Sequence, residues 1–199
     1  MPPLTGILLA AGASRRFGSN KLLAPLADGT PLAVAAARVL VAAVPKALAV
    51  VRPGDRFLAS LLAAEGLEIV ECADAQRGMG FSLAAGVAAA PAAAGWLIAL
   101  ADMPYIKEST VARLAAELAA GATLVAPVYR GRRGHPVGFG RGYRAELLAL
   151  RGDRGARAIL DRSLALLTPI AVDDPGVLYD VDWPADLSAV PARDVATAD

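Results

Sequence analysis

Cysteine and histidine are nearly absent from this chain of 199 residues, which contains one of each, Cys72 and His135. A single cysteine cannot form an internal disulfide, and one cysteine with one histidine cannot build a Cys/His zinc cluster. We expect Cys72 to be an inert, half-buried thiol rather than a nucleophile. The lack of disulfides favours a cytoplasmic location, where thiols stay reduced.

An excess of charge of either sign is also missing, because 20 basic residues nearly balance 19 acidic ones and leave a net charge of +1. A whole-surface binder of nucleic acid is therefore not expected. The charge is unevenly distributed, however. Residues 130–162 contain nine arginines and three acids, whereas residues 171–199 contain seven aspartates and one arginine. This asymmetry suits a phosphate-rich substrate beside a metal ligand, but it is equally compatible with a solvated surface.

Membrane segments are not predicted, although two apolar stretches resemble them. Residues 4–13 look like the core of a signal peptide, but no positive residue precedes them. Residues 81–101 contain no charged residue, yet they are rich in alanine and are interrupted by Pro91 and Gly95. We therefore expect a helix, a turn and a buried strand in residues 81–101, and no contact with a membrane.

Apolar strand patterns alternate with alanine-rich helix patterns along most of the chain. This alternation is typical of a three-layer α/β/α fold, in which helices cover both faces of a mostly parallel, Rossmann-like sheet. The length suits one such domain, expected over residues 1–190, with a flexible tail over residues 191–199. The expected strands are residues 4–10, 47–51, 67–70, 96–101, 123–127, 136–139, 168–172 and 178–181, with a short extended segment at 22–26; the expected helices are residues 31–43, 55–66, 81–90, 109–120, 142–150 and 155–163.

The most informative segment follows the first expected strand and has the sequence LAAGASRRFGSNK over residues 9–21. Glycines such as Gly12 can adopt backbone angles closed to other residues, and small neighbours let a ligand approach the main chain. Successive amides in such a turn can form a nest for anions, and Arg16 and Lys21 add positive charge. The segment is neither a P-loop nor a dinucleotide-binding G-x-G-x-x-G pattern. It indicates a site for a phosphorylated ligand at the carboxyl end of the first strand.

Aspartates follow two other segments that are expected to be extended. Asp102 comes directly after strand 96–101, which places it at the same sheet edge as the glycine-containing loop. It could instead cap the next helix, but Ser109 is nearer to that helix start and is the better cap. Asp180 and Asp182 are two residues apart, so they point the same way if their segment is extended.

Five segments together resemble the marks of one enzyme family. Residues 9–21 are similar to the signature L-A-x-G-x-S-x-R-M-G-x-x-K, with Phe17 in the place of Met. Residues 180–187 resemble D-x-D-T-P-x-D-L, with Trp183 in the place of Thr. The other matches are G-M-x-x-S-L at residues 78–83, G-x-x-G-H-P-V at 131–137 and L-x-G-D-x-G-A-R at 150–157. The chain thus resembles the molybdenum-cofactor cytidylyltransferases, the MocA-like branch of the MobA-like NTP transferases.

This resemblance implies a reaction. A member of the family would transfer CMP from CTP to the phosphate of molybdopterin, expected in its molybdenum-loaded form, and release pyrophosphate. Mg²⁺ would be held by Asp102 and Asp182, because this ion prefers hard oxygen ligands and takes few of them from protein. A molybdenum hydroxylase, or a maturation factor for one, would be the partner that receives the product.

The resemblance also implies roles for individual residues. Arg16, Lys21 and Asp102 would be catalytic, whereas Asp180 and Asp186 are expected to be structural, through turn or cap contacts. The acceptor would contact Arg133, His135 and Arg157. The nucleotide would contact Leu9, Ala10, Ala11, Gly12, Arg16, Lys21, Asp74, Gly80 and Ser82.

Several alternatives stay open. GTP could replace CTP, since Asp74 stands where cytidylyltransferases often carry Asn, whereas Ala11 favours CTP over the guanylyl branch. A sugar phosphate or polyol phosphate could be the acceptor, although the basic residues 130–157 argue mildly against it. The chain could also be a non-catalytic carrier of the cofactor, which the intact acidic and basic candidates disfavour. His135 is equally compatible with a structural and a functional role.

Overall fold

The computed structural model describes residues 3–12, 17 and 20–187, and folds them around one mixed sheet of eight strands. Four neighbouring strands run parallel, in the order β3 (Glu68–Glu71), β2 (Lys46–Val51), β1 (Thr5–Leu9) and β4 (Gly95–Leu100). Next to β4, the antiparallel β7 (Val137–Gly140) connects to β5 (Leu124–Tyr129), which also pairs with β6 (Arg132–Arg133) and β8 (Leu167–Ala171). The predicted, mostly parallel sheet is confirmed.

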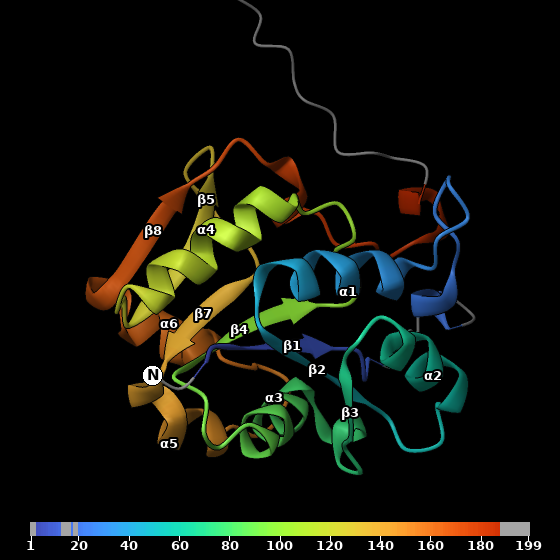
Figure 1. Cartoon of the computed structure of the whole chain (residues 1–199), viewed down its shortest axis with the longest axis horizontal. Coiled ribbons are helices and arrows are strands. Elements are labelled where there is room, and N and C mark those ends of the chain that lie inside the picture. Colours follow the sequence, from blue (N-terminus) through green and yellow to red (C-terminus); the bar gives the residue numbers. More distant parts are fainter. Residues whose placement is uncertain (1–2, 13–16, 18–19, 188–199) are drawn as a thin grey trace, which may run out of the picture.

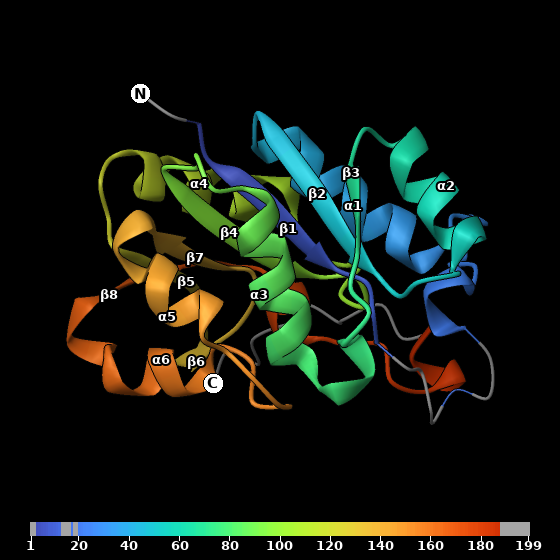
Figure 2. The ribbon, with the colours of Figure 1, turned by 90° about the horizontal axis from the view of Figure 1, so that it is seen from below.

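Helices cover both faces of this sheet and complete a three-layer α/β/α fold (Figures 1 and 2). On one face, α1 (Leu32–Ala43), α2 (Arg56–Ala64) and α4 (Glu108–Ala119) enclose one apolar core. On the other face, α3 (Met79–Ala89), α5 (Arg144–Leu148) and α6 (Arg157–Arg162) enclose a second core.

The central strands β1 and β4 determine where a ligand site can form. Every residue of β1 is buried, and so are all but the last residue of β4, as expected for parallel strands covered on both faces. Leu9 of β1 pairs with Leu100 of β4, so the loops that follow the two strands leave the sheet at the same edge. The chain moves from β1 to β2 on one side, whereas β4 lies on the other side. The crevice between these loops is therefore a switch point, the usual ligand site of α/β sheets.

The prediction of an extended segment at residues 22–26 is wrong for the first residues of that segment. A 3₁₀ turn, η1 (Lys21–Leu23), occupies it, because the side chain of Asn20 accepts a hydrogen bond from the Leu22 amide and initiates the turn. Only Pro25 makes an isolated bridge, to Pro31.

The prediction of a strand at residues 178–181 is also wrong. The 3₁₀ turn η5 (Pro175–Leu178) occupies its start, and the backbone that follows does not join the sheet. The amide of Val181 instead donates to the carbonyl of Asp102. The alternation of apolar and acidic residues there reflects contacts with a loop rather than with a strand.

The cap expected at Ser109 is not formed, and Asp55 at the start of another helix makes no cap either. Asp55 stands at the start of α2 but makes no side-chain cap, and its carboxylate accepts from Asn20 Nδ2 at 3.0 Å instead. Ser109 lies inside α4, whose start is capped from a distance by Asp174. This carboxylate accepts from the Lys107 amide at 2.9 Å and from the Thr110 hydroxyl at 2.7 Å.

The stretch that resembles a membrane segment forms most of α3, a turn and β4, as predicted. Within the described part of the chain, no helix is both long and apolar enough to cross a membrane. The predicted tail, residues 191–199, lies outside the described residues, as does the predicted domain boundary at residue 190.

Gly176 in η5 lies too close to a neighbouring backbone to carry a side chain. A Cβ at this position would be 2.1 Å from the carbonyl oxygen of Tyr105. We predict that Gly176→Ala lowers the free energy of unfolding by about 1–3 kcal/mol, the usual cost of overpacking a buried position. Urea denaturation curves measure this change.

The control for this prediction is Gly142→Ala, because a Cβ at Gly142 meets nothing within 4 Å. The control should not destabilise the protein. Equal stability of the two variants would contradict the tight packing of η5.

Candidate active site

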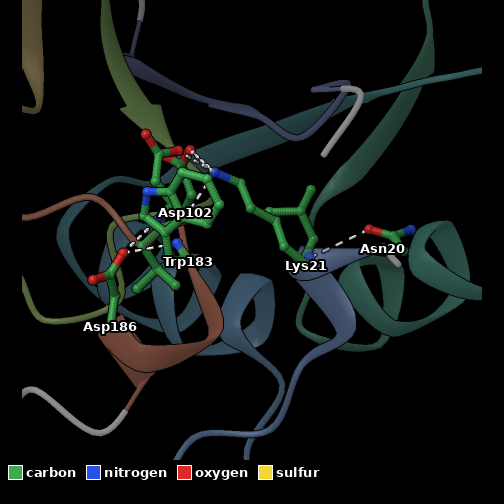
Figure 3. A network of polar contacts seen from close by, with 8 residues as sticks. Asn20, Lys21, Asp102, Trp183 and Asp186 are labelled. Atoms are coloured by element: carbon green, nitrogen blue, oxygen red, sulfur yellow. Dashed lines mark hydrogen bonds and ion pairs between the residues drawn. The ribbon is translucent and has the colours of Figure 1, made fainter. Parts of the chain in front are cut away.

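Lys21 joins two aspartates that the sequence analysis proposes as metal ligands. Its Nζ donates to Asp102 Oδ2 at 2.9 Å and to Asp182 Oδ1 at 3.1 Å. A third hydrogen bond goes to the backbone carbonyl of Val181 at 2.9 Å. Figure 3 shows the lysine side chain reaching toward Asp102, beside Trp183. We call Lys21, Asp102 and Asp182 the Lys21 hub.

The backbone around each member holds the Lys21 hub in place. Lys21 begins η1, which Asn20 caps, and Asp102 follows β4 at the switch point of the sheet. Asp186 fixes the third member, because its Oδ2 accepts from the amides of Asp182 at 2.9 Å and Trp183 at 2.7 Å (Figure 3). Asp186 therefore makes the cap contacts expected of it.

The hub contains a buried cation, because the side chain of Lys21 is only 11% exposed. Burial alone would lower the pKa of Lys21, but the charges and hydrogen bonds of Asp102 and Asp182 outweigh burial and raise it above its ordinary value. The ammonium is therefore fully charged at neutral pH. Burial, together with repulsion from Asp182 and Asp102, raises the pKa of nearby Asp180. A further cation beside these carboxylates would relieve that repulsion.

A first cavity, of about 280 Å³, opens at the switch point and reaches Asp102. Five predicted site residues line it and come from the ends of β1 and β4 and from α3: Leu9, Ala11, Gly12, Ser82 and Asp102. The rest of its wall consists of Ala75, Gln76, Gly78, Met79, Leu100 and Asp153.

Some residues predicted to contact the nucleotide lie behind this wall. Ala10 is buried, and its amide donates to the carbonyl of Val50. Lys21 does not line the first cavity but contacts Asp102, which does. Arg16, predicted to be catalytic, lies outside the described residues.

Asp74 and Gly80 also stay out of the lining of the first cavity. The exposed carboxylate of Asp74 pairs with Arg77 at 3.0 Å. Gly80 makes a backbone contact instead, because its amide donates to the carbonyl of Gly152 at 2.8 Å. Gly80 thus docks α3 onto the loop that precedes α6.

A second cavity, of about 360 Å³, adjoins the first, since Leu9, Met79 and Leu100 line both. The three residues predicted to contact the acceptor come together here with one more arginine. The polar lining is Arg133, His135, Arg154 and Arg157, and the remaining wall is Leu83, Ile98, Gly134, Val137, Ala156 and Leu160. The second cavity is therefore lined by cationic and by apolar side chains.

His135 presents a largely buried imidazole to the second cavity. Its Nδ1 has no hydrogen-bond partner among the described residues, whereas its backbone amide donates to the carbonyl of Val177 at 2.9 Å. Burial lowers the pKa of His135 and outweighs the opposing charge of Asp102. The imidazole is therefore neutral at pH 7.

Sequence reasoning missed one residue in the lining of each cavity and one that supports the segment leading to Asp182. Asp153 lines the first cavity and Arg154 the second, and both lie in the matched segment 150–157, which could have drawn attention to them. Asp174, only 1% exposed, anchors the start of the segment that leads to Asp182. No local pattern marks Asp174, because its partners on α4 are more than 60 residues away in sequence.

The carboxylates of the Lys21 hub suit a small divalent cation. Asp102 and Asp182 offer hard oxygen donors that lie close together, because both reach one ammonium nitrogen. Their side chains are 25% and 37% exposed, which leaves space for water or phosphate oxygens to complete a coordination shell. Among the described residues, no group of three or more His, Cys, Asp or Glu could hold a metal. An ion that takes few of its ligands from protein fits these two carboxylates.

Residues 6–166 match the family described as the MobA-like NTP transferase domain, and the chain belongs to this family of nucleotidyltransferases. Two relatives match it over nearly their whole length. Nicotine blue oxidoreductase of Paenarthrobacter nicotinovorans is 34% identical, over 92% of this chain and 93% of that protein. Purine catabolism protein PucB of Bacillus subtilis is 30% identical, over 95% of this chain and 96% of that protein.

Solved structures of other proteins share the fold of this chain. Rv0371c of Mycobacterium tuberculosis superposes with a TM-score of 0.82 and 29% identity, covering 93% of this chain and 95% of that one. The same mycobacterial protein has also been solved in complex with manganese, with a TM-score of 0.71 to this chain. These matches confirm the single-domain α/β fold, and the family model confirms that the chain is a MobA-like NTP transferase.

The buried imidazole generates a prediction about pH. Because folding lowers the pKa of His135 below its ordinary value of 6.5, the unfolded chain binds more protons than the folded chain between the two pKa values. The contribution of His135 to stability should therefore fall as the pH drops below 6.5 toward the folded-state pKa.

His135 is the only histidine in the chain, so the imidazole proton resonances of untagged protein report its pKa directly. We expect an NMR titration midpoint below 6.5. A midpoint at or above this value would contradict the burial of the ring.

Proposed function

We propose that this chain is a CTP:molybdopterin cytidylyltransferase, which transfers CMP to the phosphate of molybdenum-loaded molybdopterin and releases pyrophosphate. The observation that supports this most is the Lys21 hub, which brings Asp102 and Asp182 together beside the first cavity. Two carboxylates next to a glycine-containing loop suit a nucleoside triphosphate with its divalent cation. The family defines the class of reaction, and the base and the acceptor are the proposed part.

CTP would occupy the first cavity. Backbone amides after β1, together with Arg16, and with Lys21 once it exchanges a carboxylate contact for a phosphate, would hold the β- and γ-phosphates and stabilise the leaving pyrophosphate. Ser82 at the start of α3 would bond the ribose or the base, while Asp74 would act from the rim. The methyl group of Ala11, which lines the cavity, leaves less space than a glycine would, and this favours the smaller pyrimidine base.

The acceptor would enter the second cavity, where Arg133, His135 and Arg157 would contact it. An oxygen of its phosphate attacks the α-phosphorus of CTP in line. A new P–O bond forms while the bond to the bridging oxygen breaks, and the electron pair leaves with pyrophosphate. The attacking phosphate is already ionised at neutral pH, so no base is required and neutral His135 orients the acceptor. Catalysis is then positioning and charge neutralisation.

Mg²⁺ would be held by Asp102 and Asp182, where it would neutralise phosphate charge. The buried ammonium of Lys21 keeps the two carboxylates together before any substrate arrives. A cytoplasmic molybdenum hydroxylase, or its maturation factor, would receive the finished cofactor. GTP as the nucleotide, or a sugar or polyol phosphate as the acceptor, are the nearest alternatives.

A redox function is a second candidate, because a relative 34% identical to this chain is named an oxidoreductase. The neutral, buried His135 and the apolar wall of the second cavity would also accommodate a planar heterocycle. Against this candidate, the carboxylates of the Lys21 hub have no evident use in hydride transfer. Oxidation of reduced nicotinamide cofactors with nicotine blue as acceptor distinguishes the two functions.

The test of the proposed function is pyrophosphate release with each of the four NTPs, with and without molybdopterin, in Mg²⁺ or in EDTA. We expect release only when molybdopterin and Mg²⁺ are both present, and fastest with CTP. Faster release with GTP would reassign the nucleotide. Binding of molybdopterin without release for any NTP would contradict the transferase and favour a carrier.

Removal of either charge of the Lys21 hub should abolish the reaction. We predict that Lys21→Ala and Asp102→Ala each lower the rate of pyrophosphate release about 10²–10³-fold, because each removes a charged group from the site of phosphoryl transfer. The control is Lys46→Ala, at the opposite end of the sheet, which should keep the wild-type rate. Either hub variant within tenfold of the wild type, with native circular dichroism, would exclude its assigned role.

A further inference from the structure

We propose that Asp161, which contacts two arginines of the second cavity, is an internal substitute for the acceptor's phosphate on those arginines, and that Arg154 captures this phosphate when it enters. The proposal rests on the proposed function in one respect, since it takes the second cavity as the acceptor site. Three arginines line this cavity, and they differ in what they already contact.

Two of these arginines share the carboxylate of Asp161. Arg133 Nη2 donates to Asp161 Oδ1 at 3.3 Å, and Arg157 Nε lies 3.8 Å from Asp161 Oδ2. Both distances are long for charge-assisted hydrogen bonds. The side chain of Asp161 is 56% exposed and that of Arg157 is 81% exposed, so water screens the pairs. A phosphate can therefore replace Asp161 on both arginines at little cost.

Arg154 is different, because no described residue forms a hydrogen bond or an ion pair with its guanidinium. Its neighbours in sequence are engaged elsewhere. Arg151 lies over the ring of Phe81 at 5.4 Å, and Arg162 pairs with Glu146. Arg154 thus offers an available cation at the wall of the second cavity.

The loop that carries Arg154 is held rigidly against the start of α3. Gly78 has a φ of 129°, and a Cβ there would lie 2.3 Å from the carbonyl carbon of Gly152. The amide of Gly80 donates to the same carbonyl group. Beyond this contact, Asp153 lines the first cavity and Arg154 the second. The docked loop therefore directs an anion toward one cavity and a cation toward the other.

The balance of charge defines the class of ligand. The described residues that line or contact this cavity carry three positive charges and one negative charge. The positive charges are those of Arg133, Arg154 and Arg157, and the negative charge is that of Asp161. Because His135 is neutral, two positive charges remain, which match the dianion of a phosphate monoester. The rest of the lining is largely apolar and suits an uncharged ring attached to that phosphate. The ligand is therefore a phosphate monoester of a ring compound.

Two substitutions test this assignment in opposite directions. Asp161→Asn keeps the shape of the side chain and removes the competing charge, so it should strengthen phosphate binding. Arg154→Gln removes the available cation and should weaken binding. A merely structural role for the two residues would weaken binding in both variants.

The probe is inorganic phosphate at about pH 8, where it is mainly dianionic, with sodium chloride added to keep the ionic strength constant. The imidazole resonances of His135, the only histidine, report binding in untagged protein. We expect phosphate affinity to rise about threefold in Asp161→Asn and to fall about tenfold in Arg154→Gln. The matched controls Glu146→Gln and Arg162→Gln break an ion pair outside the cavity and should leave the affinity unchanged.

Steady-state assays with molybdopterin and CTP complete the test. The KM for molybdopterin should move with the phosphate affinity in both variants, while the KM for CTP stays within twofold of the wild type. Phosphate affinities that do not move in opposite directions overturn the proposal. If the two variants change phosphate affinity in opposite directions but the wild type releases no pyrophosphate with any NTP, the proposed function is overturned and the anion site is supported.

Discussion

The buried ammonium of Lys21 is the constraint on which the rest of the site depends. A charged group taken out of water is tolerated only when opposite charges and hydrogen-bond acceptors surround it. Lys21 therefore requires Asp102, Asp182 and the carbonyl of Val181 at the same place. The segments that follow β1, β4 and η5 must meet for this to happen, and the fold itself thereby brings Asp102 and Asp182 together.

The two cavities differ in the charge of the side chains that line them. Asp102 and Asp153 make the lining of the first cavity partly acidic, whereas three arginines make the second cationic. They meet at Leu9, Met79 and Leu100, where the two apolar central strands end. A nucleotide and a phosphorylated acceptor would therefore approach each other across an uncharged boundary. The family of nucleotidyltransferases to which the chain belongs joins two such substrates.

The sequence predicts the layers of the fold well, because β1 and β4 are apolar throughout and the helices between strands are rich in alanine. It fails at residues 178–181, where alternation resembles a strand but the backbone bonds to the Asp102 loop. It likewise misses Asp174, because a cap supplied from 64 residues away leaves no local pattern. Within the site, the resemblance to the family, and not the spacing of the residues, implies that Asp102 and Asp182 are partners. That Lys21 binds both of them depends on long-range packing, which the sequence does not encode in any short segment.

The central claim is that the Lys21 hub is a preformed site for a divalent cation and a nucleotide. A crystal structure with Mn²⁺ and a non-hydrolysable CTP analogue tests it directly, since the anomalous signal locates the metal. The account predicts a peak at about 2.0–2.2 Å from carboxylate oxygens of both Asp102 and Asp182, with the analogue in the first cavity. A metal bound elsewhere, with Lys21 still paired to both carboxylates beside the bound nucleotide, would contradict it.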